Sequence, residues 1–190
     1  MKKFWVTAAL AALALQLAVP LAMIWKKERV IVKGEIVYFR SQPVDPYDPF
    51  RGRFVTLSIS DDAKWTDKVP KSKRVSGKIW VRFTKDKDGM MEAIEARRSK
   101  TDAEGVWLRI PFEGSVDKNE NVSIDLPFNR FYMEEKSAIE ADKHLAGWRN
   151  RNNHKSVAVV RVLDGEAVLT DVLVDGQPIR EFVKAKRAEK

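Results

Sequence analysis

The chain has 190 residues, of which 44% are hydrophobic and 33% charged, with a formal net charge of +8 and no cysteine. This length predicts one ordinary domain plus an accessory segment, and the composition is that of a folded chain. The lack of cysteine excludes disulfides, thiolate metal sites and cysteine nucleophiles. The positive charge favours an anionic partner.

The N-terminus carries an uncharged apolar segment, FWVTAALAALALQLAVPLAMIW, at residues 4–25. Its 22 residues exceed the roughly 20 that a helix needs to cross the hydrocarbon core. Trp5 and Trp25 stand near its two ends, where indole rings favour the headgroup region. We therefore expect residues 1–25 to form a membrane anchor through which the chain contacts the lipid bilayer. A cleaved signal peptide and a buried soluble helix are the alternatives.

The flanking charges leave the orientation of this anchor open. Two basic residues precede the span and three follow it closely, so the positive-inside count does not decide. Long domains, however, translocate largely regardless of charge. We therefore expect a single-pass protein of the inner membrane, whose residues 26–190 form one domain facing the periplasm or the cell exterior.

Beyond the anchor the pattern is mostly β. Residues 31–39 predict a strand with a bulge or kink at Gly34. Residues 52–60 alternate, with Val55, Leu57 and Ile59 facing inward. Further strands are expected at residues 78–84, 90–98, 105–112, 121–128, 155–163 and 166–174, with hairpin turns at Lys87-Asp88-Gly89 and Asp164-Gly165.

One helix and a tail complete the expected elements. Residues 134–148, EEKSAIEADKHLAGW, carry apolar side chains at helical spacing. The closing run KAKRAEK is charged and is expected to fray as a C-terminal tail. The sequence thus predicts a mainly β domain, an antiparallel barrel or sandwich with one inserted α-helix, preceded by a transmembrane helix.

The segment PVDPYDPFRG, residues 43–52, combines rigidity with charge. Its prolines impose extended or turn geometry on the residues before them. Asp45 and Asp48 can accept backbone hydrogen bonds, Arg51 can pair with either carboxylate, and Gly52 permits unusual backbone angles. A structural corner is the favoured interpretation and a binding loop the second. We expect no metal here, because calcium requires six to eight oxygen ligands.

The same segment resembles the lead-in P-V-D-P-x-D-x-x-R-G of the bacterial GDYXXLXY family. In the core motif Gly52 and Leu57 match, whereas Arg53, Phe54 and Ile59 replace an aspartate and two tyrosines, so the motif is degenerate. Residues 129–140 are similar to the family's later aromatic-then-glutamate segment. The family is functionally uncharacterised. Its members look like membrane-anchored proteins often encoded beside multi-pass membrane proteins, so the resemblance implies a partner of that kind.

The positive charge is concentrated between Lys64 and Lys100, a segment that contains twelve lysines and arginines but only five acidic residues. Lys78, Trp80 and Arg82 would share one face of a strand. The favoured interpretation is a solvated face with Trp80 half-covered by lysine stems. The second is contact with an anionic lipid or an envelope polymer, which a tryptophan between cations suits. Nucleic acid is disfavoured for a domain outside the cytoplasm.

No catalytic residue can be assigned from the sequence. The two histidines, His144 and His154, lack metal-type spacing, and adjacent Glu134 and Glu135 would diverge on a helix. No phosphate-binding loop, dinucleotide fingerprint or zinc motif occurs, and we expect no cofactor. The sequence favours a non-enzymatic accessory or binding domain on the outer face of the inner membrane. An envelope hydrolase with unidentified catalytic residues is the alternative.

Overall fold

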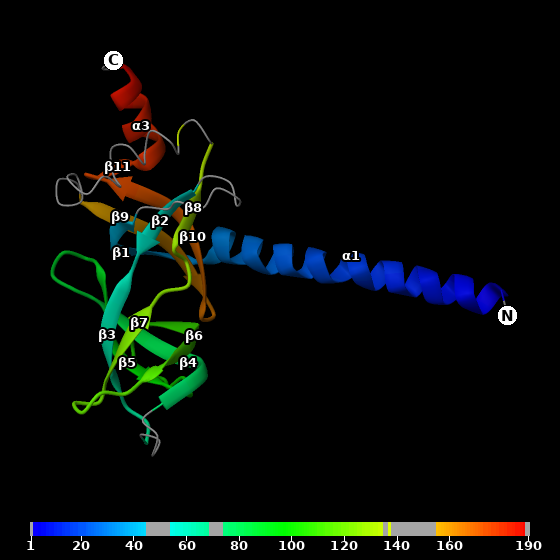
Figure 1. Ribbon diagram of the computed structural model, residues 1–190, viewed down its shortest axis with the longest axis horizontal. Helices are drawn as coiled ribbons and strands as arrows, with labels where there is room; N and C mark the ends of the chain where they lie inside the picture. Colours follow the sequence, from blue (N-terminus) through cyan, green and yellow to red (C-terminus); the bar gives the residue numbers. More distant parts are fainter. Residues whose placement is uncertain (1, 45–53, 69–73, 135–136, 138–154, 189–190) are drawn as a thin grey trace.

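The computed structural model describes residues 2–44, 54–68, 74–134, 137 and 155–188; for residues 2–3, 7–11, 42–44 and 54–56 it describes the backbone only. These residues form a mainly β structure with a helix at each end of the chain, which confirms the predicted class (Figure 1). The elements in chain order are α1 (Lys2–Lys33), β1 (Glu35–Val44), β2 (Phe54–Ser58), β3 (Ser60–Trp65), β4 (Arg74–Lys85), β5 (Met91–Arg97), β6 (Val106–Ser115), β7 (Asn121–Asp125), β8 (Arg130–Tyr132), β9 (Ser156–Leu163), β10 (Glu166–Val174), β11 (Gln177–Pro178) and α3 (Ile179–Ala188).

The strands form two sheets. A six-stranded sheet has the order β11-β10-β9-β1-β2-β8, and a five-stranded sheet has the order β6-β4-β5-β3-β7. The chain passes from the first sheet to the second at Ile59, the single residue between β2 and β3. The prediction of purely antiparallel pairing is wrong at one place, because β3 pairs with β5 in parallel. These two strands are not consecutive, so no hairpin constrains their relative direction.

One hydrophobic core joins the two sheets. Ile79, Val81 and Phe83 of β4 are buried, as their alternation predicts. Phe83 meets Phe39 of the other sheet edge to face, with ring centroids 5.2 Å apart. At the surface above them, Arg40 of β1 bonds Asp86 at 2.5 Å and Asp88 at 2.7 Å in the β4–β5 turn. The sheets are therefore held together by both core packing and ion pairs.

Helix α1 is longer than predicted. It continues to Lys33, so residues 31–33 are helical and the predicted strand begins only at Glu35. Val30 is 2% exposed, so the last turns of the helix pack against the sheets. Gly34 ends the helix, its N–H donating to the carbonyl of Val30 at 2.8 Å. A Cβ at this position would overlap that carbonyl, which makes Gly34 a helix end and not a strand bulge.

The rest of α1 extends away from the sheets (Figure 1). Eleven large apolar side chains between Phe4 and Trp25 are 53% to 70% exposed. Among the residues that the structure describes, no helix combines the length and the apolarity needed to cross a membrane.

The C-terminal segment is a helix and not a frayed tail. In α3, Ile179, Phe182 and Val183 are buried. Their i, i+3, i+4 spacing places them on one face, and packing of that face stabilises a helix whose other residues are mostly charged. The helix predicted at residues 134–148 lies almost wholly outside the described residues.

Candidate functional site

The last turns of α1 are clamped to the turn between β9 and β10. Lys26 and Lys27 both donate to the carboxylate of Glu166, at 2.7 Å and 2.9 Å. One turn further on, Arg29 lies 3.6 Å from a carboxylate oxygen of Asp164. The basic run that follows the apolar segment thus meets an acidic turn more than 130 residues away in sequence.

Glu166 is held in its ionised form near neutral pH by this arrangement. The hydrogen bonds from Lys26 and Lys27 lower the pKa of its carboxyl from 4.5 to about 2, against the opposing effect of partial burial. A carboxylate with so low a pKa is a poor proton acceptor near neutral pH. The clamp therefore fits a structural role, in which Glu166 fastens Lys26 and Lys27 to the β9–β10 turn.

The same turn also contacts the second sheet. Asp164 and Gly165 have φ angles of 52° and 81°, as a two-residue type I′ hairpin requires. The carbonyl of Gly165 accepts a hydrogen bond from the N–H of Arg109 in β6 at 2.9 Å. A Cβ on Gly165 would lie 2.7 Å from Cη2 of Trp80 and closer still to Cζ3, so the turn lies directly against the indole.

A groove opens where these three parts meet. We call it the junction groove; it has a volume of about 230 Å³ and its walls include Lys26, Arg29, Trp80, Arg109, Asp164 and Glu166. The Arg109 guanidinium lies over the Trp80 ring, 5.9 Å from its centroid. Both carboxylates of the groove already have cationic partners. Arg109 has no carboxylate partner among the described residues. The groove is therefore suited to an anion.

The predicted basic face is only partly brought together. Lys78 is exposed on β4, whereas Trp80 is half-buried and lies against Gly165 and Arg109. Arg82 has a different environment. Its side chain is 19% exposed and pairs with Glu95 at 3.3 Å, while a second nitrogen donates to the carbonyl of Glu104 at 3.2 Å. Arg82 is thus a structural cation.

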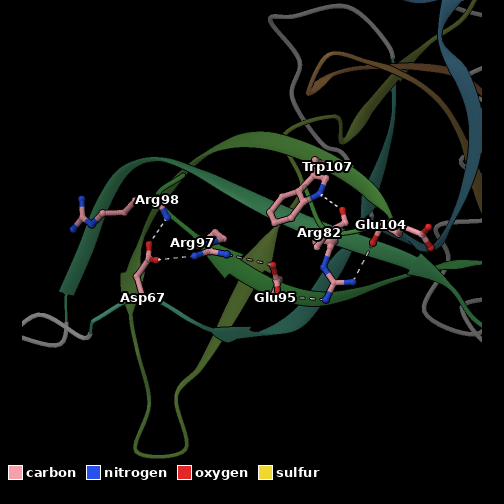
Figure 2. Close-up of polar contacts among 8 residues, drawn as sticks. Asp67, Arg82, Glu95, Arg97, Arg98, Glu104 and Trp107 are labelled. Atoms are coloured by element: carbon pink, nitrogen blue, oxygen red, sulfur yellow. Dashed lines mark hydrogen bonds and ion pairs between the residues drawn. The ribbon is translucent and has the colours of Figure 1, made fainter. Parts of the chain in front are cut away.

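Arg82 belongs to a polar cluster on the outer face of the second sheet, drawn in Figure 2. Arg97 lies 4.0 Å from Glu95 and 3.6 Å from Asp67. Asp67 also accepts the backbone N–H of Arg98 at 2.6 Å. Trp107 donates from its ring nitrogen to the carbonyl of Ala103 at 3.0 Å, which holds the β5–β6 loop over the sheet. These contacts pair two basic residues of the Lys64–Lys100 segment, Arg82 and Arg97, with acidic residues of the same segment.

A β-bulge creates this cluster, and the sequence analysis missed it. Phe83 pairs with Ala93, but the register then shifts and Arg82 pairs with Glu95. Without the shift Arg82 would face Ile94, and Glu95 would point to the core. The one available signal was the break in alternation that leaves Ala96, not Glu95, as the third inward residue after Met91 and Ala93.

The other predicted site residues lie outside the described residues. This holds for the candidate loop Asp45, Asp48, Arg51 and Gly52, and for both histidines. Within the described part of the chain, no group of three or more His, Cys, Asp or Glu side chains could hold a metal ion.

A comparison with protein-family models finds one match, to the GDYXXLXY protein model, over residues 16–172. This chain belongs to the GDYXXLXY family. No curated protein and no solved structure matches it. The matched range includes all the residues named above as walls of the junction groove, from Lys26 to Glu166.

The structure assigns a packing role to the described part of the GDYXXLXY motif. Leu57 and Ile59 stand at the leucine and final tyrosine positions, and both are buried in the core. Ile59 is also the residue at which the chain changes sheets. The replacement of tyrosine by isoleucine therefore keeps an apolar side chain in the core at that point.

Proposed function

We propose that this GDYXXLXY protein is a membrane-anchored, non-enzymatic accessory or binding domain on the outer face of the bacterial inner membrane, acting with a multi-pass membrane-protein partner. The proposal includes the finer fold description, a sandwich or barrel with a helix inserted between β8 and β9 and a transmembrane helix at residues 4–25. Within this helix, the structure describes only the backbone of residues 7–11.

The observation that carries the proposal is the exposed apolar surface of α1. Eleven large apolar side chains of residues 4–25 are more than half exposed, on all sides of the helix. At about 25 cal/mol per Å² of apolar surface, leaving such a helix in water is very unfavourable. Lipid tails or the helices of a membrane protein would cover it on every side.

The clamp to Glu166 supports a role in positioning. Because Lys26, Lys27 and Arg29 are tied to the β9–β10 turn, the domain follows the last turns of α1 without a free linker. A domain attached in this way would be held at a defined height and orientation above the membrane. A domain held at a fixed height and orientation is better suited to binding a neighbouring membrane protein than to binding a substrate far from the membrane.

The test is purification of the full-length protein in a mild detergent, with identification of what co-purifies. We expect a stoichiometric membrane-protein partner. A matched variant replaces residues 4–25 with an unrelated transmembrane helix, which retains anchoring but removes the native helix surface. Turnover of an envelope substrate by the purified protein, abolished by one point substitution, would instead favour a hydrolase.

A further inference from the structure

We propose that the junction groove binds the phosphate of an anionic phospholipid headgroup. The inference rests on the proposed function, because it takes residues 4–25 as the membrane span. It goes further by naming a ligand class and the residue that selects it, Arg109.

The groove lies at the depth of the headgroups if the helix spans the bilayer. Trp25 ends the apolar segment, and Lys26 is the next residue and a wall of the groove. At 1.5 Å per residue, Arg29 is only about 6 Å further along the helix. The headgroup region on each side of the hydrocarbon core is about as thick. Lipid headgroups would therefore be the anions nearest to the groove.

The charges in the groove favour an anion and leave one cation available for it. Lys26 and Arg29 are directed to Glu166 and Asp164, whereas the Arg109 guanidinium lies over the Trp80 ring. A guanidinium in this position can donate two parallel N–H bonds to phosphate oxygens. Arg29 can contribute as well, because its contact with Asp164 is long and that carboxylate is 74% exposed.

The size of the groove favours a headgroup over an envelope polymer. Its volume of about 230 Å³ is below the 300–1,000 Å³ of typical small-molecule pockets. A polymer chain would need an extended cleft with repeated contacts. A single phosphate with a short substituent, whose acyl chains remain beside α1, needs only a small site.

The experiment measures lipid binding by the full-length protein in uncharged maltoside micelles. Phosphatidylglycerol or phosphatidylcholine is titrated in, and the first bound lipid is quantified by native mass spectrometry. We expect phosphatidylglycerol to bind about tenfold more tightly than phosphatidylcholine, and Arg109→Gln to remove that preference. Arg109→Lys should restore part of it, because the charge returns without the planar fork.

The matched control is Arg180→Gln. Arg180 also lies over an aromatic ring, 5.6 Å from the centroid of Phe131, but in α3 at the other end of β10. This variant should keep the full preference for phosphatidylglycerol. Equal binding of the two lipids by the wild type would overturn the proposal, as would an unchanged preference in Arg109→Gln. Displacement of the lipid by millimolar inorganic phosphate would overturn the lipid source in favour of a free-anion site.

Failure of the groove and failure of the anchor are distinguishable. Arg109→Gln should stay in carbonate-washed membranes like the wild type, because α1 is unchanged. Release of the wild type by carbonate would contradict the anchor. Binding of phosphatidylglycerol is measured in micelles and does not depend on the outcome of the carbonate extraction.

Discussion

Gly165 and Trp80 lie where the two sheets and the N-terminal helix come together. The turn that holds Gly165 accepts hydrogen bonds from Lys26 of α1 and from the backbone N–H of Arg109 in β6, and so links both elements to the first sheet. The sequence placed Trp80 on a half-covered strand face or in contact with an anionic surface, and in the structure its ring lies against the turn at Gly165. Residues at this point contact α1, the β9–β10 turn and the second sheet together, so small substitutions should measurably change the stability of the protein.

Gly165→Ala should destabilise the protein more than Gly176→Ala does. Both glycines occupy the second position of an Asp-Gly turn, with φ angles of 81° and 84°. A Cβ at Gly176 meets nothing within 4 Å, so that variant measures backbone strain alone, about 1 kcal/mol. At Gly165 the Cβ also clashes with Trp80, which should add about 1–3 kcal/mol. Urea unfolding of both variants gives the difference; equal losses would contradict the contact.

Glu166 should make stability pH-dependent in acid. Its folded pKa of about 2 lies below the unfolded value of 4.5, so the stabilisation is fully present above pH 4.5 and is lost as the pH falls towards 2. Because the side chain is 36% exposed, screening limits the effect to about 1 kcal/mol. Unfolding midpoints of the wild type and Glu166→Gln, measured from pH 6 to 2, should converge in acid. A constant difference across that range would exclude the clamp.

At the scale of elements, α3 and the β4–β5 hairpin depart most from expectation. The sequence of α3 is dominated by charge, yet three apolar positions suffice to dock it. The hairpin was predicted correctly, but its bulge changed which residues share a face. In α3, burial of three apolar side chains outweighed the charged composition of the segment. In the hairpin, the bulge outweighed the regular alternation of side chains.

Phe182→Ala tests whether α3 is part of the fold. Phe182 is 7% exposed, so its truncation should cost about 3–5 kcal/mol. Lys184→Ala, two residues on and exposed, should change stability by less than about 0.5 kcal/mol. Thermal melts of the full-length protein in detergent provide the measurement. If Phe182→Ala melts like Lys184→Ala, the segment is a frayed tail.

The whole molecule consists of one long N-terminal helix joined to a two-sheet domain. The exposed surface of α1 favours a membrane, and the clamp ties the domain closely to it. The net charge of +8 is consistent with a location beside anionic lipids.

The full-length protein should resist carbonate extraction, and a periplasmic-type reporter fused after Lys190 should be active. A cytoplasmic-type reporter at the same position should be silent. The reason is the uncharged segment at residues 4–25, followed by a long domain of the kind that translocates largely regardless of charge. A mature form lacking residues 1–22, recovered from native membranes, would show a signal peptide instead. Activity of the cytoplasmic reporter would reverse the orientation.

The sequence by itself determined the β-rich class, the β4–β5 and β9–β10 hairpins and the family, because alternation, Asp-Gly turns and the lead-in to the GDYXXLXY motif are local signals. Only the tertiary structure decided that α1 runs to Lys33, that Glu166 accepts hydrogen bonds from Lys26 and Lys27, and that Arg109 lies over the Trp80 ring. The last two contacts join residues that are distant in the chain, and their meeting depends on the order of the strands. No local pattern encodes that order, since it follows from how the sheets bury their apolar faces against each other.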